Sequence, residues 1–238
     1  MSRFRVGIDI GGTFTDIVFL NSEGRLFTKK VPSSVDNYAR AIVEGMAEVF
    51  DEASITPKDI RELRHGTTVA SNAILELKGA RVGLITSAGF RDVLEIRTLR
   101  MPRLYDLAWE KPPALVERYL RQVVDERINA NGVIERRPQR SEVEQVVRRL
   151  LDEKVEAIAI CLINAYANPD NERFVEQIVK EMAPDLPLCI SADVLPEMKE
   201  YERTSTTVIN AYVLPVVGTY LTALRKGLDG DGISAPII

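Results

Sequence analysis

The chain has 238 residues, of which 45% are hydrophobic and 28% are charged. This composition is typical of globular proteins and excludes a disordered, collagen-like or coiled-coil chain. Its 31 basic and 35 acidic residues give a net charge of −4, which does not support a surface that coats nucleic acid.

The sequence has neither an unbroken run of about 18 apolar residues nor a long apolar segment near the N-terminus. We therefore expect no membrane-spanning helix and no secretory signal, and we expect a cytoplasmic protein. Cys161 and Cys189 lie in apolar segments, where we expect reduced core thiols rather than a disulfide.

Three strands are expected at the start of the chain. Residues 3–10 alternate apolar and polar side chains, and further strand-like segments cover 14–20 and 26–31. Glycine-containing turn signals at 11–12 and 21–24 separate them. Short turns between consecutive strands predict an antiparallel meander.

After residue 36 the pattern alternates between helix and strand. Helices are expected at about 38–50, after Gly66, and from about 141, 170 and 201–204, the last running to 224 with a break at Pro215. Strands are expected at 62–65, 82–86, 157–163 and 188–191, with a strand pair at 122–128 and 132–135. This order predicts an α/β fold whose mixed sheet combines the N-terminal antiparallel meander with flanking helices.

The most informative segment is 9–16, Asp-Ile-Gly-Gly-Thr-Phe-Thr-Asp, between the first two strands. Two glycines permit unusual backbone conformations and close approach of a ligand, and consecutive N–H groups can bind an anion. Thr13 and Thr15 add hydroxyl donors, whereas Asp9 and Asp16 fit if a divalent cation lies between carboxylate and phosphate. A plain hairpin turn is the alternative. The segment matches neither a Walker A loop nor a dinucleotide fingerprint.

His65 is the single histidine and stands at a strand end before Gly66. It is either a hydrogen-bonded structural residue or part of a cleft, and one histidine with two separated cysteines does not favour a zinc site. Thr67, Thr68 and Asn72 follow; they can donate to a small polar substrate, or a threonine can simply cap the next helix.

Two groups of charged residues are further candidates for a cleft. One is an arginine cluster beside the irregular segment 98–113, formed by Arg91, Arg97, Arg100 and Arg103. The other precedes the last helix and consists of Glu197, Glu200, Glu202 and Arg203. A guanidinium group binds carboxylate or phosphate, but a solvated charged face and intrachain ion pairs are the simpler interpretations.

Four segments together resemble the hydantoinase/5-oxoprolinase family, which includes N-methylhydantoinase A and acetone carboxylase β subunits, within the actin-like ATPase superfamily. They are 9–16, 64–76, 89–96 and 200–213. The resemblance implies an actin/ribonuclease-H-like lobe. It also implies that 1–200 is the N-terminal domain of this family and that 201–238 is the truncated start of a second hydantoinase A domain.

The resemblance further implies an enzyme that opens a cyclic amide, hydantoin or 5-oxoproline, with ATP hydrolysis. ATP and Mg²⁺ are the expected cofactors, and a second subunit or domain of the hydantoinase B type is the expected partner, with no nucleic acid or membrane. The roles implied are catalysis for Asp9 and His65, metal binding for Asp9, ATP binding for Gly11, Gly12, Thr13, Thr15 and Asp16, and substrate binding for Thr67, Thr68, Asn72, Arg91 and Arg203.

Other functions stay open. One is ATP-dependent carboxylation of a ketone such as acetone, and another is a non-catalytic nucleotide-binding regulatory module. A sugar or acyl kinase is disfavoured by segments 64–76 and 200–213. An actin-like site uses a phosphate loop from each of two lobes, and only one is present, since 229–232 lacks the threonine. We therefore expect an N-terminal lobe that binds ATP weakly and is inactive by itself.

Overall fold

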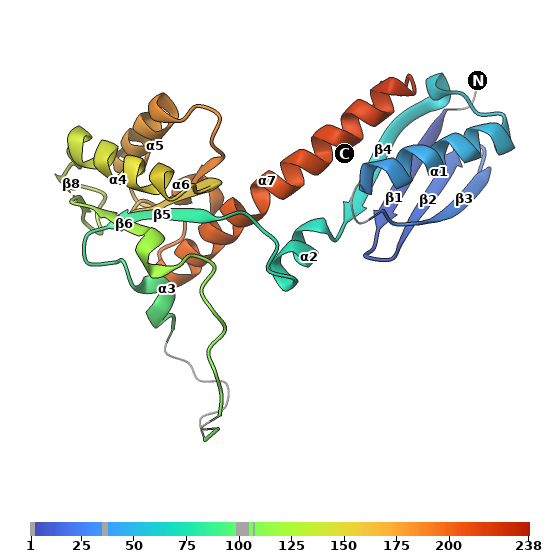
Figure 1. Ribbon diagram of the computed structural model, residues 1–238. Helices are drawn as coiled ribbons and strands as arrows, with labels where there is room; N and C mark the ends of the chain where they lie inside the picture. Colours follow the sequence, from blue (N-terminus) through green and yellow to red (C-terminus); the bar gives the residue numbers. More distant parts are fainter. Residues whose placement is uncertain (1–2, 35–37, 99–104, 107) are drawn as a thin grey trace. The chain divides into compact units, whose positions relative to one another are not determined.

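The computed structural model describes residues 3–34, 38–98, 105–106 and 108–238 (Figure 1). The chain divides into two compact units. Unit 1 consists of residues 1–78 and 216–238, and unit 2 consists of residues 79–215. The last helix, α7 (Glu200–Gly230), contributes residues to both units.

Unit 1 is built on a mixed sheet in the order β3-β2-β1-β4. Its strands are β1 (Phe4–Ile10), β2 (Phe14–Asn21), β3 (Leu26–Pro32) and β4 (Ile60–Thr67). The first three are antiparallel, and β4 runs parallel to β1. The C-terminal residues extend this sheet, because Ile237 forms a parallel bridge with Leu63 of β4.

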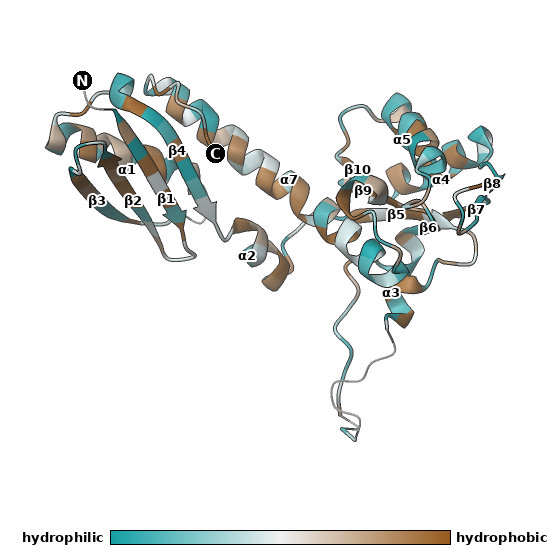
Figure 2. Ribbon diagram, turned by 180° about the vertical axis from the view of Figure 1, so that it is seen from behind, coloured by the Kyte–Doolittle hydropathy of each residue, from teal (hydrophilic) through white to brown (hydrophobic). Residues whose placement is uncertain are grey.

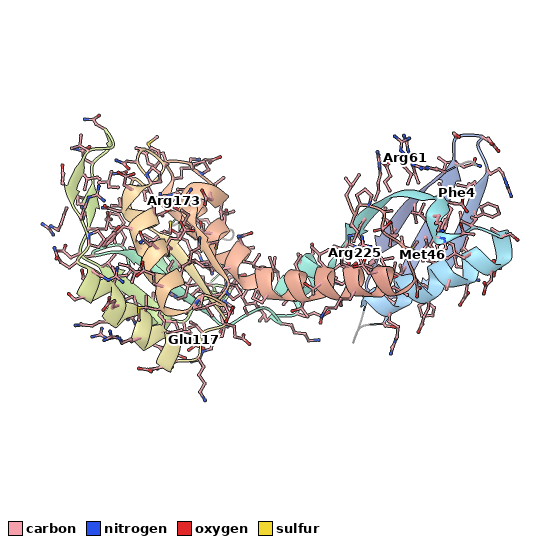
Figure 3. The ribbon with its side chains drawn as sticks, turned by 90° about the horizontal axis from the view of Figure 1, so that it is seen from above. Phe4, Met46, Arg61, Glu117, Arg173 and Arg225 are labelled. Carbon is pink, nitrogen blue, oxygen red and sulfur yellow. The ribbon has the colours of Figure 1, made fainter. Side chains whose placement is uncertain are left out.

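The core of unit 1 lies on one face of this sheet. Alternate residues of β1 and β2, including Phe4 and Ile17, are buried there. The helix α1 (Tyr38–Ala53) packs on this face with Met46, as Figure 3 shows for Phe4 and Met46, and the C-terminal half of α7 adds Leu224 to the same core. Two short elements, η1 (Pro57–Asp59) and α2 (Val69–Leu75), flank β4.

The other face of the sheet is exposed among the described residues. Arg5 and Asp9 of β1 and Val18 and Leu20 of β2 point there. Because successive side chains of a strand point to opposite faces, buried and exposed residues alternate along β1 and β2 of this sheet.

Unit 2 is built on a parallel sheet in the order β10-β9-β5-β6. Its strands are β5 (Val82–Ser87), β6 (Arg121–Val124), β9 (Ala157–Cys161) and β10 (Leu188–Ile190), with a separate hairpin of β7 (Arg127–Ile128) and β8 (Ile134–Arg136). Its other elements are α3 (Val93–Ile96), η2 (Arg118–Leu120), α4 (Arg140–Asp152), α5 (Asp170–Met182) and α6 (Ser191–Val194).

Every residue of β5 and β9 is buried, which is typical of parallel strands covered on both faces. In Figure 2, β9 is brown, the colour of hydrophobic residues, whereas α4 and α5 carry much teal, the colour of hydrophilic ones.

The predicted α/β class, with a mixed sheet, an N-terminal meander and flanking helices, is confirmed. Three details were wrong. Among the described residues the strands form two four-stranded sheets and a two-stranded hairpin instead of one sheet. The segment expected as one strand at 122–128 is divided, since β6 joins β5 and only β7 pairs with β8. The reason lies at its middle, where the Glu126 carboxylate turns inward and accepts a hydrogen bond from Ser87.

The third difference is that α7 continues through Pro215 without a break. Proline lacks an N–H and removes one helical hydrogen bond. Tyr212, before the proline, is buried in unit 2, and Tyr220, after it, is buried in unit 1. The predicted domain boundary at residues 200–201 falls at the start of α7. The two compact units divide instead after residues 78 and 215, so this boundary stays a prediction.

By length and composition alone, α7 is long and apolar enough to cross a membrane. The core helix of a globular protein passes the same test. This helix buries Val208 and Ala211 in unit 2 and Leu224 and Leu228 in unit 1, and it also buries the charged Arg203.

Candidate functional site

The β1–β2 turn presents backbone donors to solvent. Gly12 and Thr13 are exposed, and among the described residues their N–H groups have no backbone acceptor. The Gly11 N–H instead closes the turn on the Phe14 carbonyl at 3.0 Å. Neither Gly11 nor Gly12 has a positive φ, so this turn does not use the left-handed conformation that glycine permits. A Cβ on Gly11 would lie 3.2 Å from the Phe14 oxygen, a tight contact that the backbone would have to shift slightly to accept.

A buried pair of hydroxyls supports this turn from behind. Thr15 is fully buried, and its Oγ1 lies 2.9 Å from Ser33 Oγ. Ser33 Oγ donates to the Gly11 carbonyl at 2.8 Å, and the Ser33 N–H donates to the Thr13 carbonyl at 2.9 Å. Thr15 therefore belongs to the scaffold of the turn in this geometry. Sequence reasoning missed Ser33, because nothing in the sequence indicates that the end of β3 returns to the turn.

Two carboxylates stand side by side next to the turn. Asp9 on β1 and Asp16 on β2 are directly opposite each other, and both are exposed. Like charges in this position repel. Lys30 offsets part of the repulsion with an ion pair to Asp16 at 3.1 Å, whereas the Asp9 carboxylate has no ion pair in the described part of the chain. The pair is thus suited to bind a cation.

A cleft of about 690 Å³ opens beside Asp9 and Asp16. It is lined by Gly7, Ile8, Asp9, Asp16, Val18, Arg64, His65, Gly66 and Ile238. The described residues contain no cluster of three or more histidine, cysteine or acidic side chains suited to a metal. A cation held here would therefore need oxygens from water or a ligand to complete its coordination.

His65 connects this cleft to the core. Its Nε2 is hydrogen-bonded to the Tyr220 hydroxyl of α7, and the two ring centroids are 5.4 Å apart. Partial burial lowers the pKa of His65, and the negative charge of Asp9 opposes this shift. Burial raises the pKa of Tyr220. At neutral pH we therefore expect a neutral imidazole beside a protonated phenol.

The polar residues after β4 also meet the turn. The Thr68 N–H and hydroxyl both donate to the Ile10 carbonyl, at 3.2 and 3.1 Å. Asn72 Nδ2 donates to Thr68 Oγ1 at 3.3 Å and lies 3.7 Å from the position of a Cβ on Gly12. Thr67 Oγ1 accepts from the Val69 N–H at 3.1 Å, and Thr68 is the N-cap residue of α2, without a side-chain cap hydrogen bond.

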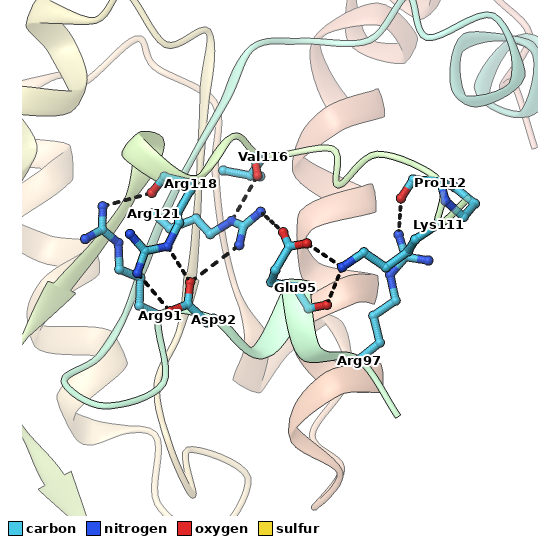
Figure 4. A network of polar contacts seen from close by, with 9 residues as sticks. All are labelled: Arg91, Asp92, Glu95, Arg97, Lys111, Pro112, Val116, Arg118 and Arg121. Atoms are coloured by element: carbon cyan, nitrogen blue, oxygen red, sulfur yellow. Dashed lines mark hydrogen bonds and ion pairs between the residues drawn. The ribbon is translucent and has the colours of Figure 1, made fainter. Parts of the chain in front are cut away.

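The remaining candidates belong to unit 2 and are engaged there. Arg91 donates to the Arg118 carbonyl at 3.0 Å within a network that ties α3 to residues 111–121 (Figure 4). In the same network Arg97 donates to the Pro112 carbonyl. Arg100 and Arg103 lie outside the described residues.

Arg203 is 1% exposed, donates to Ser191 Oγ at 3.3 Å, and stacks over the Tyr166 ring. It belongs to a buried polar network centred on Glu172, which sequence reasoning missed. Burial raises the pKa of Glu172, while hydrogen bonds from Ser191 and two backbone N–H groups oppose the shift. The free thiol of Cys161 is buried nearby, and that of Cys189 is half-buried.

Comparison with known proteins places this geometry in context. Residues 5–183 match the family described as hydantoinase/oxoprolinase N-terminal region. Caprolactamase subunit alpha of Pseudomonas jessenii is 35% identical over 240 residues, which cover 98% of this chain and 34% of that protein. The crystal structure of this ATP-dependent caprolactamase matches with a TM-score of 0.90.

Two further relatives are more distant. The 5-oxoprolinase 1 of Arabidopsis thaliana is 31% identical, with 96% of this chain and 20% of that protein covered. The nucleotide-free structure of acetone carboxylase, titled for ATP-dependent acetone carboxylation, matches with a TM-score of 0.86 and 25% identity, covering 98% of this chain and 35% of that chain. This chain thus spans about a third or less of the length of these relatives.

Proposed function

This chain belongs to the hydantoinase/oxoprolinase family, and we propose that it supplies the ATP-phosphate-binding part of an enzyme that opens a cyclic amide with ATP hydrolysis. The observation that carries the proposal is the β1–β2 turn. Two outward backbone N–H groups lie next to two exposed carboxylates at the edge of a cleft. Backbone donors suit phosphate oxygens, and carboxylates suit a divalent cation.

Within this proposal each residue of the turn has a distinct task. Gly12 and Thr13 bind phosphate through their N–H groups, and the exposed Thr13 hydroxyl adds a donor. Asp9 binds Mg²⁺, and Asp16 acts on the water shell of the cation. Thr15 supports the turn through Ser33, at 2.9 Å. Bound ATP supplies a phosphoryl group that makes an unreactive amide electrophilic, so the task of these residues is positioning and charge neutralisation.

The residues around the cleft serve the substrate side. His65 lies in its wall and Asn72 lies beside Gly12, so both are placed to act near the terminal phosphate. Arg91 and Arg203, as engaged in unit 2, are assigned to structure in this proposal.

Two further expectations concern the whole protein. Relatives are titled as alpha and gamma subunits, which supports a second subunit of the hydantoinase B type as partner. A cytoplasmic location fits the use of ATP and the two free thiols.

The second candidate reaction is ATP-dependent carboxylation of a ketone, favoured by the likeness to acetone carboxylase. Both reactions use the same ATP site, so the cleft by itself does not distinguish them. A panel of hydantoins, 5-oxoproline, lactams and ketones, tested with the protein and its partner subunit, distinguishes the two reactions. Ring opening of a cyclic amide requires water, whereas carboxylation of a ketone requires bicarbonate.

Titration calorimetry of this chain with Mg-ATP tests the phosphate site directly. Asp9→Ala should weaken binding at least about tenfold, because a charge-assisted contact contributes roughly 1.5–3 kcal/mol. Asp51→Ala, an exposed carboxylate on α1, is the matched control and should leave binding unchanged. Equal binding by the Asp9→Ala variant would remove the metal assignment.

A further inference from the structure

Gly7 and Gly66 lie inside strands of unit 1, on the exposed face of its sheet. Gly7 stands in the middle of β1 between Val6 and Ile8, which are buried on the core face, so position 7 belongs to the opposite face. Gly66, near the end of β4, is exposed. Both glycines line the cleft of about 690 Å³ beside the β1–β2 turn. We refer to the part of this cleft over the two glycines as the glycine hollow.

Packing among the described residues requires neither glycine. A Cβ on Gly7 would meet no atom within 4 Å, and a Cβ on Gly66 would make ordinary contacts, the nearest at 3.5 Å with Asp9 Oδ1. Neither glycine has a positive φ. Gly83, a strand glycine of unit 2, differs in this respect, because a Cβ there would lie 2.9 Å from the Leu150 side chain. The contacts of the chain therefore explain Gly83 and leave Gly7 and Gly66 unexplained.

A β-bulge is another common reason for a glycine inside a strand. The pairing of β1 with β2 is regular, and the pairing of β1 with β4 shifts between Phe4 and Arg5, away from both glycines. A glycine also weakens its strand, because it loses more conformational freedom on folding than any other residue. The remaining explanation for a strand glycine is that a ligand or another backbone comes close to the sheet at this place.

The side chains around the glycine hollow favour a small polar ligand. Val18 and Arg64 stand directly opposite Gly7 on the two neighbouring strands, and Asp9 stands directly opposite Gly66. All three side chains are exposed. Arg64 uses its Nε for an ion pair on its own strand, and its two terminal nitrogens form no hydrogen bond among the described residues. A protein segment packed closely on the hollow would bury these charges at a cost, whereas a small ligand can pair with them.

We propose that the glycine hollow binds the cyclic amide substrate, with the flat ring lying on the bare backbone of Gly7 and Gly66. This inference rests on the proposed function and adds the place where the substrate binds. The amide oxygen then faces the β1–β2 turn, and the ring carbons contact Val18. A second oxygen acceptor on the ring, the other carbonyl of hydantoin or the carboxylate of 5-oxoproline, accepts from the terminal nitrogens of Arg64. The ligand class is a small cyclic amide with a second oxygen acceptor.

Two-dimensional ¹H–¹⁵N NMR of the chain, titrated with 5-oxoproline in the presence of Mg-ADP, tests this proposal. The expected result is a saturable shift of the backbone signals of Gly7, Val18 and Gly66. Mg-ADP added alone should shift the signals of Gly12 and Thr13, so the β1–β2 turn and the glycine hollow succeed or fail separately. The same ring without the carboxylate, 2-pyrrolidinone, should bind about tenfold more weakly or worse, because it lacks the charge-assisted contact.

Substitutions of Gly7 fill the hollow without a clash, since a Cβ there has no neighbour within 4 Å, and valine is favoured in strands. Gly7→Val should weaken 5-oxoproline binding about tenfold or more, and Gly7→Ala should have a smaller effect in the same direction. Neither variant should weaken Mg-ADP binding or lower the unfolding temperature. A purely structural glycine would behave in the opposite way, with lower stability and no specific loss of 5-oxoproline binding.

The matched control is Gly218→Ala on α7, another exposed glycine where a Cβ would meet no atom within 4 Å. It should change the affinity for 5-oxoproline less than about twofold, as for a distant site. The proposal is overturned if millimolar 5-oxoproline leaves the signals of Gly7, Val18 and Gly66 unmoved, or if Gly7→Val binds it as the unsubstituted chain does. It is also overturned if Gly7→Val lowers the unfolding temperature, because a protein segment would then occupy the hollow. Unmoved signals of Gly12 and Thr13 with Mg-ADP would instead contradict the proposed phosphate site.

Discussion

The two units use the same types of polar residue in opposite ways. In unit 1 the sheet is covered on one face, and its charged residues, such as Asp9 and Arg5, lie on the exposed face. In unit 2 the parallel strands are covered on both faces, and Glu172 and Arg203 are buried within the fold. Charged residues of the same types therefore face solvent in one unit and are satisfied by internal contacts in the other.

Solvent exposure is the physical basis of this difference. A buried carboxylate must be satisfied by hydrogen bonds from the protein itself, and it then has no capacity left for a ligand. An exposed carboxylate such as Asp9 keeps its oxygens available. Substitutions in unit 2 should therefore affect mainly stability, and substitutions in the exposed face of unit 1 should affect mainly binding.

The largest effect is expected at Glu172. Its carboxylate accepts hydrogen bonds from the Leu162 N–H at 2.8 Å, Ser191 Oγ at 2.6 Å and the Ala192 N–H at 2.9 Å. Glu172→Ala leaves these buried donors unpaired and should lower the free energy of unfolding by roughly 3–5 kcal/mol. Urea unfolding monitored by circular dichroism measures it.

Glu172→Gln keeps an acceptor in place and should be less destabilising than Glu172→Ala. Glu181→Ala, on the exposed side of the same helix, is the control with little expected effect. A Glu172→Ala variant as stable as Glu181→Ala would contradict the view of unit 2 as an internal polar network.

An intermediate effect is expected at Thr15, whose hydroxyl supports the β1–β2 turn through Ser33. Thr15→Val keeps the shape and removes the hydrogen bond to Ser33, so unfolding free energy should fall by about 1–2 kcal/mol. Because the turn is then less well held, affinity for Mg-ATP should fall as well. Thr28→Val on β3, where the side chain is exposed, should alter neither quantity. Equal behaviour of the two variants would show that the hydroxyl pair does not support the turn.

The smallest effect is expected from the pH dependence at His65. Its pKa is lowered in the folded state by partial burial, so the unfolded chain binds the proton more readily. The contribution of this group to stability is complete above its ordinary pKa of about 6.5 and is lost as the pH falls from there toward the lower folded value. His65→Gln should remove this part of the pH dependence, as measured by thermal unfolding between about pH 5 and pH 8.

Tyr220→Phe removes the hydroxyl that His65 Nε2 contacts. We expect a loss of about 1 kcal/mol in unfolding free energy, together with a changed chemical shift of the imidazole nitrogens. Because the chain has one histidine, these signals need no further assignment. Tyr212→Phe, in unit 2, should leave them unchanged.

Several parts of the fold and the site follow from the sequence. The alternation of β1, the turn 9–16 and the α/β order after residue 36 are local patterns, and local patterns reflect side-chain periodicity and turn chemistry. The residue types of segment 9–16 and their order are enough to indicate an anion-binding turn. The roles of its individual residues stay predictions.

Other parts required the three-dimensional arrangement. Sequence alone does not separate Thr13, which is exposed, from Thr15, which is buried against Ser33. It also does not show that Tyr220 meets His65 across 155 positions.

By itself, the sequence determined the class of fold, the position of the β1–β2 turn and membership of the family, because these depend on the order and spacing of residue types. Tertiary structure alone decided which strands share a sheet and which polar side chains face solvent. It also decided which of them are already satisfied within the protein. The physical reason is that burial and hydrogen-bond pairing depend on contacts between segments far apart in the chain, and they decide whether a polar group is available to a ligand.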